Sequence, residues 1–292
     1  MKNNVSGMRY CGRDFTKADI NLIRDIICSD PKLNRQKISK LVCEALNWYK
    51  RDGGLKDMSC RVAMLRMQND GLIKLPPPVG RNGNGKINRL RSAACEPKLT
   101  MTIPVNSFKE LQFELVKERQ DSYLWNEYID RYHYLRFKPL PGAQLRYFVK
   151  LKEEIVALFG FGAAAWKTAP RDHFIGWNKE QRENNIHLVV NNARFLILPW
   201  ITSHNLASRI LSMVTKCLSY DWNNRYCYQP VLLESFVENG KFIGTCYKAS
   251  NWIYVGQTKG LGKVYWGRKE NLPKKDIYLY PLKKNFKQLL CS

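Results

Sequence analysis

Hydrophobic residues recur at helical spacing three times in the first quarter of the chain. In residues 15–29 the isoleucines lie on one side of a helix, and Thr16 stands three residues before Asp19, as a helix N-cap does. Residues 33–48 repeat this spacing with Ile38, Val42 and Leu46 among the apolar positions. A third run, residues 56–73, reaches a glycine stop signal at 71. The pattern predicts three short helices.

The stretch LIKLPPP, residues 72–78, predicts one short strand ended by prolines. Three helices followed by a strand are typical of a winged helix-turn-helix, which we expect over residues 1–80. Its third helix would present donors to phosphates and base edges. These are Lys56, Ser59, Arg61 and Arg66. A helical bundle with a basic surface is the alternative.

The amino-acid composition changes after residue 76, where glycine, asparagine and proline dominate. This composition is typical of a linker, which we assign to residues 81–105 between a domain at 1–80 and another at 106–292. Four of its basic residues are candidates for contact with a nucleic-acid backbone: Arg81, Lys86, Arg89 and Arg91.

The second domain begins with a predicted helix from Ser107, which stands three residues before Glu110 in a capping box. The pattern then alternates and predicts a hairpin of strands 145–151 and 155–161. Further strands are expected at 195–198, 231–237 and 252–257, with helices at 205–220 and 245–249 between them. This order is typical of an α+β fold with a mixed sheet.

Charge narrows the function. Lys plus Arg is 48 against 25 for Asp plus Glu, a formal net charge of +23, and residues 1–100 alone hold 20 basic and 9 acidic residues. Such an excess favours a polyanionic partner. DNA is the expected partner, and RNA is a further candidate. We find no apolar run long enough for a membrane span and no signal peptide, so we expect no membrane association.

The 9 cysteines are scattered without a Cys-x-x-Cys pair, which favours reduced thiols in a cytoplasmic protein and gives no metal site. The segment 259–287 holds 9 basic and 2 acidic residues with interleaved tyrosines. We interpret it as a basic C-terminal tail in which Lys259 and Lys263 contact nucleic acid, or as a solvated flank.

Candidate catalytic residues are few. His133 and Tyr134 precede the turn PLPG, and His133 is a candidate general base, metal ligand or base-contacting group. Glu234 stands in an apolar strand, where an unpaired carboxylate is costly, so it needs a partner, a place at the strand end or a role as a base. A nuclease would need Asp172, Asp221 and Glu234 to converge. A phosphate-binding loop of the Walker type is absent.

Several long segments together resemble the DruA-type family. They include CRVAMLRMQNDGLIKLPPP, HYLRFKPLPGAQLRYFV, NNARFLILPW, NLASRIL, LLESFV and GTCYKASNWIYVGQTKGLGK, and the likeness spans about residues 10–262. That family includes a component of the Druantia anti-phage systems and domains attached to some transposases. The resemblance implies a role in phage defence or in a mobile element, with other subunits of the defence system as candidate partners.

The element order of the second domain is also similar to that of Gcn5-related N-acetyltransferases. In that superfamily a helix N-terminus holds the coenzyme A pyrophosphate. The likeness implies a coenzyme A thioester as cofactor and Tyr247 as general acid. The corresponding cofactor residues here are Trp200, Ser203, Asn205, Ala207 and Ser208. The superfamily's glycines are missing from this turn. The His133–Tyr134 pair also resembles one in Mom-type DNA-modification proteins.

These observations leave open whether the protein is an enzyme. The first hypothesis is acyl transfer to DNA, RNA or protein, with His133, Glu234 or Tyr247 moving protons. The second is a non-catalytic DNA-recognition subunit on a degenerate acetyltransferase-like fold. A nuclease or an accessory factor in transposition is the third.

Overall fold

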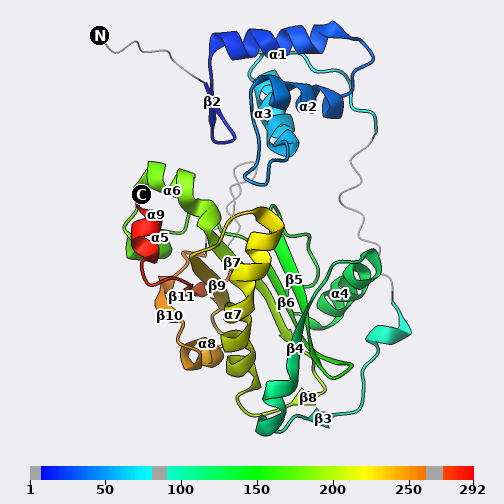
Figure 1. The fold of residues 1–292 in the computed structure, drawn as a ribbon, viewed down its shortest axis with the longest axis vertical. Coiled ribbons are helices and arrows are strands. Elements are labelled where there is room, and N and C mark those ends of the chain that lie inside the picture. Colours follow the sequence, from blue (N-terminus) through cyan, green and yellow to red (C-terminus); the bar gives the residue numbers. More distant parts are fainter. Residues whose placement is uncertain (1–7, 81–90, 261–271) are drawn as a thin grey trace. The chain divides into compact units, whose positions relative to one another are not determined.

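The structure, a computed structural model, describes residues 8–80, 91–260 and 272–292. The chain divides into two compact units, Met1–Ile87 and Asn88–Ser292 (Figure 1). Each unit has hydrophobic clusters of its own, built from residues of that unit alone. None of the helices in the described ranges is both long and apolar enough to cross a membrane.

In the first unit a short hairpin is followed along the chain by three helices. Strands β1 (Met8–Tyr10) and β2 (Arg13–Phe15) pair antiparallel, and the helices are α1 (Lys17–Ser29), α2 (Arg35–Ala45) and α3 (Asp57–Asn69). The predicted helices are therefore present. Thr16 caps α1 in a full capping box with Asp19. Ile23, Ile38 and Met67 meet in the core.

The strand expected in residues 72–78 is wrong, because this segment forms no strand. Ile73 and Leu75 are buried in the helical core instead. Side chains of the helices bind the peptide groups, as the amide of Leu75 donates to Oε1 of Gln68 and Nε of Arg35 donates to the carbonyl of Pro76. With its polar groups satisfied in this way, the segment needs no partner strand, and it supplies no wing.

The second unit is a mixed sheet of seven strands in the order β10-β11-β9-β7-β6-β5-β4, with helices packed on it. The strands are β4 (Leu111–Leu115), β5 (Gln144–Leu151), β6 (Glu154–Ala163), β7 (Val189–Ile197), β9 (Leu232–Glu238), β10 (Ile253–Gln257) and β11 (Lys275–Pro281). The helices are α4 (Arg119–Tyr132), α5 (Ala169–Ile175), α6 (Lys179–Asn185), α7 (Leu206–Tyr226), α8 (Thr245–Ala249) and α9 (Phe286–Leu290). The predicted α+β class with a mixed sheet is confirmed.

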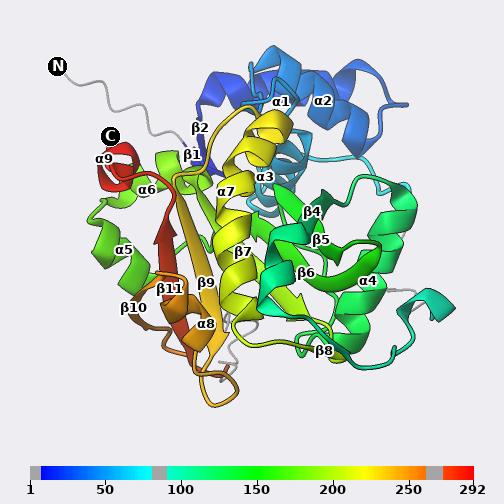
Figure 2. The same cartoon turned by 60° about the horizontal axis from the view of Figure 1, so that its bottom comes forward.

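Helices α7 and α4 cover opposite faces of the sheet. Tyr147 of β5 donates from its hydroxyl to Asp221 of α7, whereas Gly160 of β6 faces Trp125 of α4. Tyr147 pairs with Phe159, and neighbouring positions along a strand alternate in face, so the two contacts lie on opposite sides. Figure 2 shows α5, α6 and α9 gathered toward the β10–β11 side and α4 toward the β4 side.

Two expectations for this unit are corrected. The helix predicted from Ser107 is a 3₁₀ turn (Val105–Glu110) followed by strand β4, and α4 begins only at Arg119. Leu111, Phe113 and Leu115 alternate along β4, which pairs with β5 at the sheet edge. The basic C-terminal segment is in part sheet, because β11 lies between β9 and β10.

Candidate functional site

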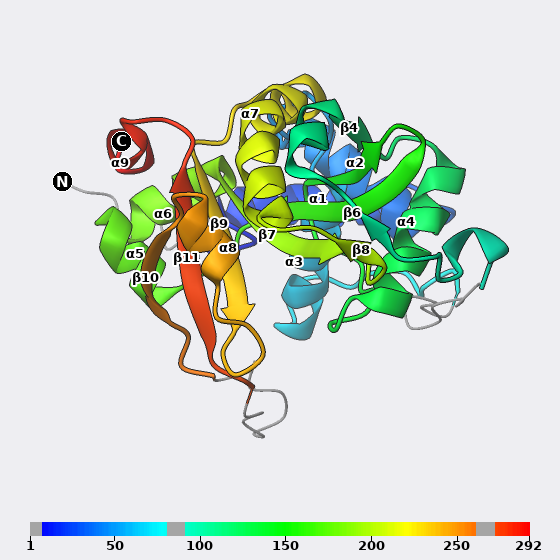
Figure 3. The same ribbon diagram turned by 90° about the horizontal axis from the view of Figure 1, so that it is seen from below.

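The seven-stranded sheet divides between β7 and β9, the two neighbouring strands that run parallel. Strands β7 and β9 pair in parallel from Val189 and Leu232 as far as Asn192 and Ser235, and the ladder between them ends there. Beyond these residues each strand continues, paired only on its outer side in the described sheet, β7 with β6 and β9 with β11. Figure 3 shows the two halves of the sheet spreading from this point. We call the divergence the fork.

Tyr247 of α8 lies at the closed end of the fork. Its hydroxyl oxygen accepts hydrogen bonds from Oγ of Ser235 at 2.9 Å and Nδ2 of Asn192 at 3.2 Å. Its ring stacks on Tyr278 with centroids 5.3 Å apart. Burial raises the pKa of Tyr247 above its usual value, although the bonds from Ser235 and Asn192 act in the opposite direction. The phenol therefore stays protonated near neutral pH.

Gly244 fixes how α8 enters. It has φ +69°, and a Cβ at this position would overlap the ring and hydroxyl of Tyr278. Only glycine meets both conditions at once. The sequence GTCYKA therefore brings Tyr247 close to the sheet because its first residue lacks a side chain.

His133 and Tyr134 follow α4 and stack on each other, with centroids 4.8 Å apart. Nδ1 of His133 accepts the backbone N–H of Leu135 at 3.1 Å, so the neutral ring carries its proton on Nε2. Burial lowers the pKa of His133 to about 4, and the charge of Arg194 adds to this. At neutral pH His133 is thus a neutral hydrogen-bond donor whose Nδ1 lone pair is already used.

Tyr134 extends this stack toward the surface. Lys241 lies 5.0 Å from its ring centroid and Phe242 lies 5.2 Å away. Lys241 also pairs with Glu238 at 2.8 Å. Tyr134 and Phe242 are both exposed, so a cation and two aromatic rings share one patch of surface.

Glu234 is fully buried and bound to Arg171 of α5 at 2.7 Å. Its Oε1 accepts the amide of Ala165 at 2.7 Å. Burial raises the pKa of Glu234, and the Arg171 charge opposes that shift. Because Ser235, its neighbour in β9, contacts Tyr247, Glu234 points to the opposite face from Tyr247. The structure therefore does not bring the two together.

The three carboxylates named for a nuclease do not converge. Asp172 shares Arg171 with Glu234, whereas Asp221 accepts a hydrogen bond from Tyr147. In the parts of the chain that the structure describes, no group of three or more His, Cys, Asp or Glu is arranged to hold a metal ion.

The turn expected to hold a coenzyme A pyrophosphate is bound on its N-terminal side to another strand. Strand β3 (Met101–Thr102) pairs in parallel with β8 (Ile201–Thr202), immediately after Trp200. Ser203 donates from its hydroxyl to the carbonyl of Ile103 at 2.6 Å. Trp200 is buried against Tyr132, so both residues already have structural partners.

The first residues of α7 differ from the expected anion cap. Asn205 precedes the helix with φ +60° and makes no side-chain capping bond. Ser208 uses its hydroxyl on the carbonyl of Asn205 at 3.0 Å. Ala207 is half-buried in the first turn. In this conformation the amides of this turn are not capped by the side chain of Asn205.

The nucleic-acid candidates lie in different settings. Lys56 and Arg66 are exposed at the two ends of α3, Ser59 is half-buried, and Arg61 is paired with Asp57 at 3.0 Å. Arg91 and Lys259 are exposed. Arg81, Lys86, Arg89 and Lys263 lie outside the described residues.

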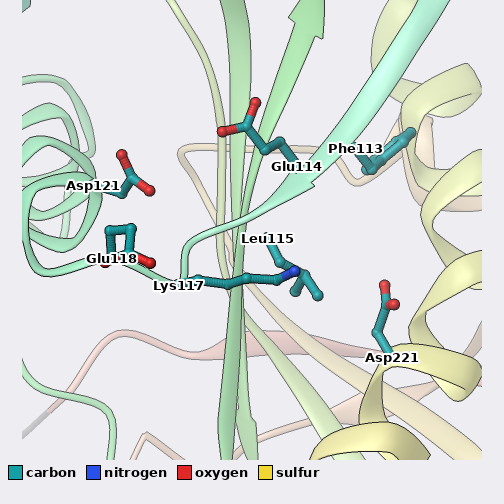
Figure 4. Close-up of a pocket in the computed structure, with 7 residues that line it drawn as sticks. All are labelled: Phe113, Glu114, Leu115, Lys117, Glu118, Asp121 and Asp221. Carbon is teal, nitrogen blue, oxygen red and sulfur yellow. The ribbon is translucent and has the colours of Figure 1, made fainter.

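A depression of about 440 Å³ lies apart from the fork, beside the edge strand β4. Figure 4 shows that acidic side chains from β4, α4 and α7 surround it. Its lining residues are Phe113, Glu114, Leu115, Lys117, Glu118, Asp121 and Asp221. Its carboxylates would repel phosphate, so this depression is no nucleic-acid site.

The sequence missed three residues of the fork: Asn192, Arg194 and Ser235. Arg194 carries the same signal that marked Glu234, because it is a charged residue between apolar neighbours in a strand. Asn192 and Ser235 gave no such signal, since they are uncharged and a short polar side chain costs less to bury than a charge. Their role depends on the parallel pairing of β7 with β9.

Comparison with known proteins identifies the family. The fold described above is that of an α+β protein with a forked mixed sheet. This chain matches the family model described as Druantia protein DruA over residues 68–267. The chain belongs to this DruA family, as its sequence motifs indicated. A search of curated proteins finds no match.

Solved structures give a distant likeness of fold. Spermidine N-acetyltransferase from Vibrio cholerae is 11% identical with a TM-score of 0.40, covering 62% of this chain and 98% of that one. The ribosomal-protein-S18-alanine N-acetyltransferase from Escherichia coli is 9% identical with a TM-score of 0.37, covering 59% and 94%.

Proposed function

We propose that this chain is a nucleic-acid-binding protein of an anti-phage defence or mobile-element system. The observation that carries the proposal is the formal net charge of +23, in a chain that belongs to the DruA family. A polyanion gains affinity from such a surface by releasing the counterions condensed on it. We place the protein in the cytoplasm with DNA as its main partner, RNA as the alternative, and other subunits of the defence system as further partners.

Within the first unit we assign DNA contact to α3. Lys56 at its start and Arg66 at its end are exposed and have no carboxylate partner among the described residues. Arg61 contributes less, because Asp57 already neutralises it. The assignment keeps a helix-turn-helix as the proposed module, without the wing after α3.

The experiment measures the affinity of the full chain for a labelled DNA duplex by fluorescence anisotropy over a series of salt concentrations. We expect affinity to fall steeply with salt. The double variant Lys56→Gln, Arg66→Gln should lower the slope of log affinity against log salt by about 2, because each phosphate contact contributes about 0.9.

The matched control is the double variant Lys98→Gln, Lys150→Gln, which removes the same charge from lysines already paired with Glu154 and Glu114. Its slope should stay near that of the wild type. A flat salt response of the wild type contradicts the proposal. A single-stranded RNA competitor that displaces the duplex at equal concentration makes RNA the main partner.

Acyl transfer is the second candidate function, and the fork favours it. Two parallel strands that part no longer pair along their facing edges, where an extended ligand could bind their backbone groups, and Tyr247 at the closed end keeps its proton as an acid must. The setting of other residues favours a non-catalytic subunit, since Arg171 neutralises Glu234 and Leu135 occupies Nδ1 of His133.

Calorimetric titration with acetyl-coenzyme A separates the two. Saturable heat from the wild type, with product formation that Tyr247→Phe abolishes without weakening binding, supports acyl transfer. Absence of heat at millimolar ligand, with DNA binding intact, leaves the non-catalytic DNA-recognition subunit.

A further inference from the structure

Arg194 of β7 is a buried cation whose charge is not balanced. Its side chain is only 8% exposed. Nη1 donates to the carbonyl of Ala193 at 2.7 Å, and Nε has no hydrogen-bond partner. Across residues 8–80, 91–260 and 272–292, no carboxylate forms an ion pair with it. A guanidinium stays charged in proteins, so its burial without a counter-ion is costly.

Arg171 shows what a structural buried arginine looks like in the same sheet. It is fully buried, and Glu234 and Asp172 bind it at 2.7 and 2.8 Å. The carbonyl of Ala165 accepts a further bond from its Nη1 at 2.7 Å. Two carboxylates thus balance Arg171, whereas Arg194 has one carbonyl. The difference indicates that Arg194 is prepared for an anion that is not part of the chain.

Aromatic side chains and a hydrogen-bond donor, not carboxylates, lie around Arg194. A Cβ on Gly160, its partner in β6, would stand 3.2 Å from Cβ of Arg194 and 2.9 Å from Trp125, so glycine makes room for both side chains. His133 and Tyr134 lie close enough to feel the Arg194 charge. Burial lowers the pKa of His133 and Arg194 adds to that shift, whereas burial and Glu238 raise the pKa of Tyr134 and Arg194 opposes them. His133 offers an N–H at Nε2.

The carboxylate that acts on Tyr134 already has a partner. Glu238 also acts on the pKa of Tyr134, but it is paired with Lys241 at 2.8 Å. Burial lowers the pKa of Arg194, and the hydroxyl of Tyr134 opposes this shift, whereas no carboxylate forms an ion pair with Arg194 among the described residues. Glu238 is therefore not the counter-ion of Arg194.

The position of Arg194 leaves it at the fork. It lies two residues past Asn192, the last residue of β7 that pairs with β9. A register shift against β6 passes over Ala193, and such a bulge redirects the side chains next to it. The strand edge beside Arg194 therefore faces no other strand in the described sheet.

We propose that Arg194, with His133 and Tyr134 beside it, is a binding site for an oxyanion carried by a small molecule, either a phosphate ester or a carboxylate. A guanidinium binds two oxygens of such a group at once. The small size follows from burial, because a phosphate in a duplex backbone cannot reach a side chain that is 8% exposed. The site goes beyond the proposed DNA binding, which uses exposed charges.

The test is calorimetric titration of the full chain with inorganic phosphate, with ADP and with acetate. We expect saturable binding of at least one probe, and the ranking of the three separates phosphate from carboxylate. Arg194→Gln should weaken that binding about tenfold or more, because bonds between charged groups are the stronger class. Lys216→Gln, which removes one exposed positive charge from α7, should leave it unchanged.

A second readout protects the test against a variant that folds poorly. Arg194→Met should be as stable as the wild type or more so without ligand, because it replaces an unbalanced charge with an apolar chain. The wild type should gain thermal stability with the bound probe, and Arg194→Met should gain none. Equal responses in both proteins, or no binding of any probe to the wild type, overturn the proposal.

DNA binding distinguishes this inference from the proposed function. Arg194→Gln should keep the affinity and salt slope of the wild type for duplex DNA. A loss of duplex affinity as large as that of the α3 variant would contradict the assignment of Arg194 to a small molecule.

Discussion

At the scale of residues, the second unit buries charged and titratable groups in two ways. Glu234 and Arg171 neutralise each other, which makes them a structural pair. Removing one partner of such a pair leaves a buried charge and is costly. His133 and Arg194 lie near each other without a carboxylate between them, and His133 responds by staying neutral. Arg194 keeps its charge, so His133 is the group of this pair whose charge changes with pH.

His133 should make stability depend on pH. Its pKa is about 4 in the folded protein and 6.5 in the unfolded chain, so between these values the unfolded chain binds more protons. Stability should therefore fall as pH drops from 6.5 to 4, by about 3 kcal/mol at most. Urea unfolding at several pH values measures this slope.

His133→Phe should flatten that slope while keeping an aromatic ring against Tyr134. The control is His204→Gln, which removes an exposed histidine. If His133→Phe keeps the full loss of stability between pH 6.5 and 4, another group is responsible for it.

Sequence reasoning identified the charged residue but not its partner. An acidic side chain in the apolar strand LLESFV had to be paired, at a strand end, or a base, and the structure selects pairing. The partner, Arg171, lies 63 residues earlier on α5. Such a pairing depends on how β9 and α5 pack, which no local pattern in the sequence reports.

At the scale of elements, prediction succeeded where local periodicity decides the structure. The hairpin of β5 and β6 and the short helix α8 appear where expected, within a few residues. Helix α7 begins at Leu206 as expected and continues to Tyr226, beyond the predicted end at residue 220. Strand β4 was missed because the apparent capping box of Ser107 and Glu110 predicted a helix, whereas the apolar residues of β4 alternate and the strand pairs with the edge of β5. Strand β3 is a strand only because β8 pairs with it.

The hydroxyl of Ser203, in the turn after β7, donates a hydrogen bond to the carbonyl of Ile103, the residue that follows β3. Ser203→Ala should cost about 1 kcal/mol, because it leaves the carbonyl of Ile103 without its side-chain donor. Hydrogen exchange of the amides of Met101 and Ile103, which donate to Trp200 and Thr202, should become faster. Denaturant unfolding and exchange mass spectrometry measure the two effects.

Ser208→Ala is the control, since its hydroxyl bonds only to Asn205 within the same turn. It should change neither the exchange of these amides nor stability by more than a few tenths of a kcal/mol. Unchanged protection of Met101 in Ser203→Ala would show that the backbone bonds alone hold β3.

At the scale of the whole molecule, the main feature is that each of the two units has its own hydrophobic core. The cluster around Ile23, Ile38 and Met67 uses residues of the first unit only. The clusters of the second unit begin at Cys95. A chain that builds separate cores is expected to fold in separate cooperative units.

We therefore expect residues 1–87 and 88–292 to fold when produced separately. Each piece should show a cooperative thermal transition and a far-ultraviolet circular dichroism spectrum that sum to those of the full chain. Loss of cooperative unfolding in the larger piece would show that its sheet depends on the first unit.

The pairing of β3 with β8 has a consequence for the order of folding. It joins Met101 to Ile201 across the sequence and so closes a loop that contains β4, α4, β5, β6 and β7. Closing so long a loop for two residues of strand gains little enthalpy against its entropy. Contacts between residues far apart in sequence also slow folding. The sheet is therefore expected to form first, and β3 to close over the turn at Trp200 as one of the last steps.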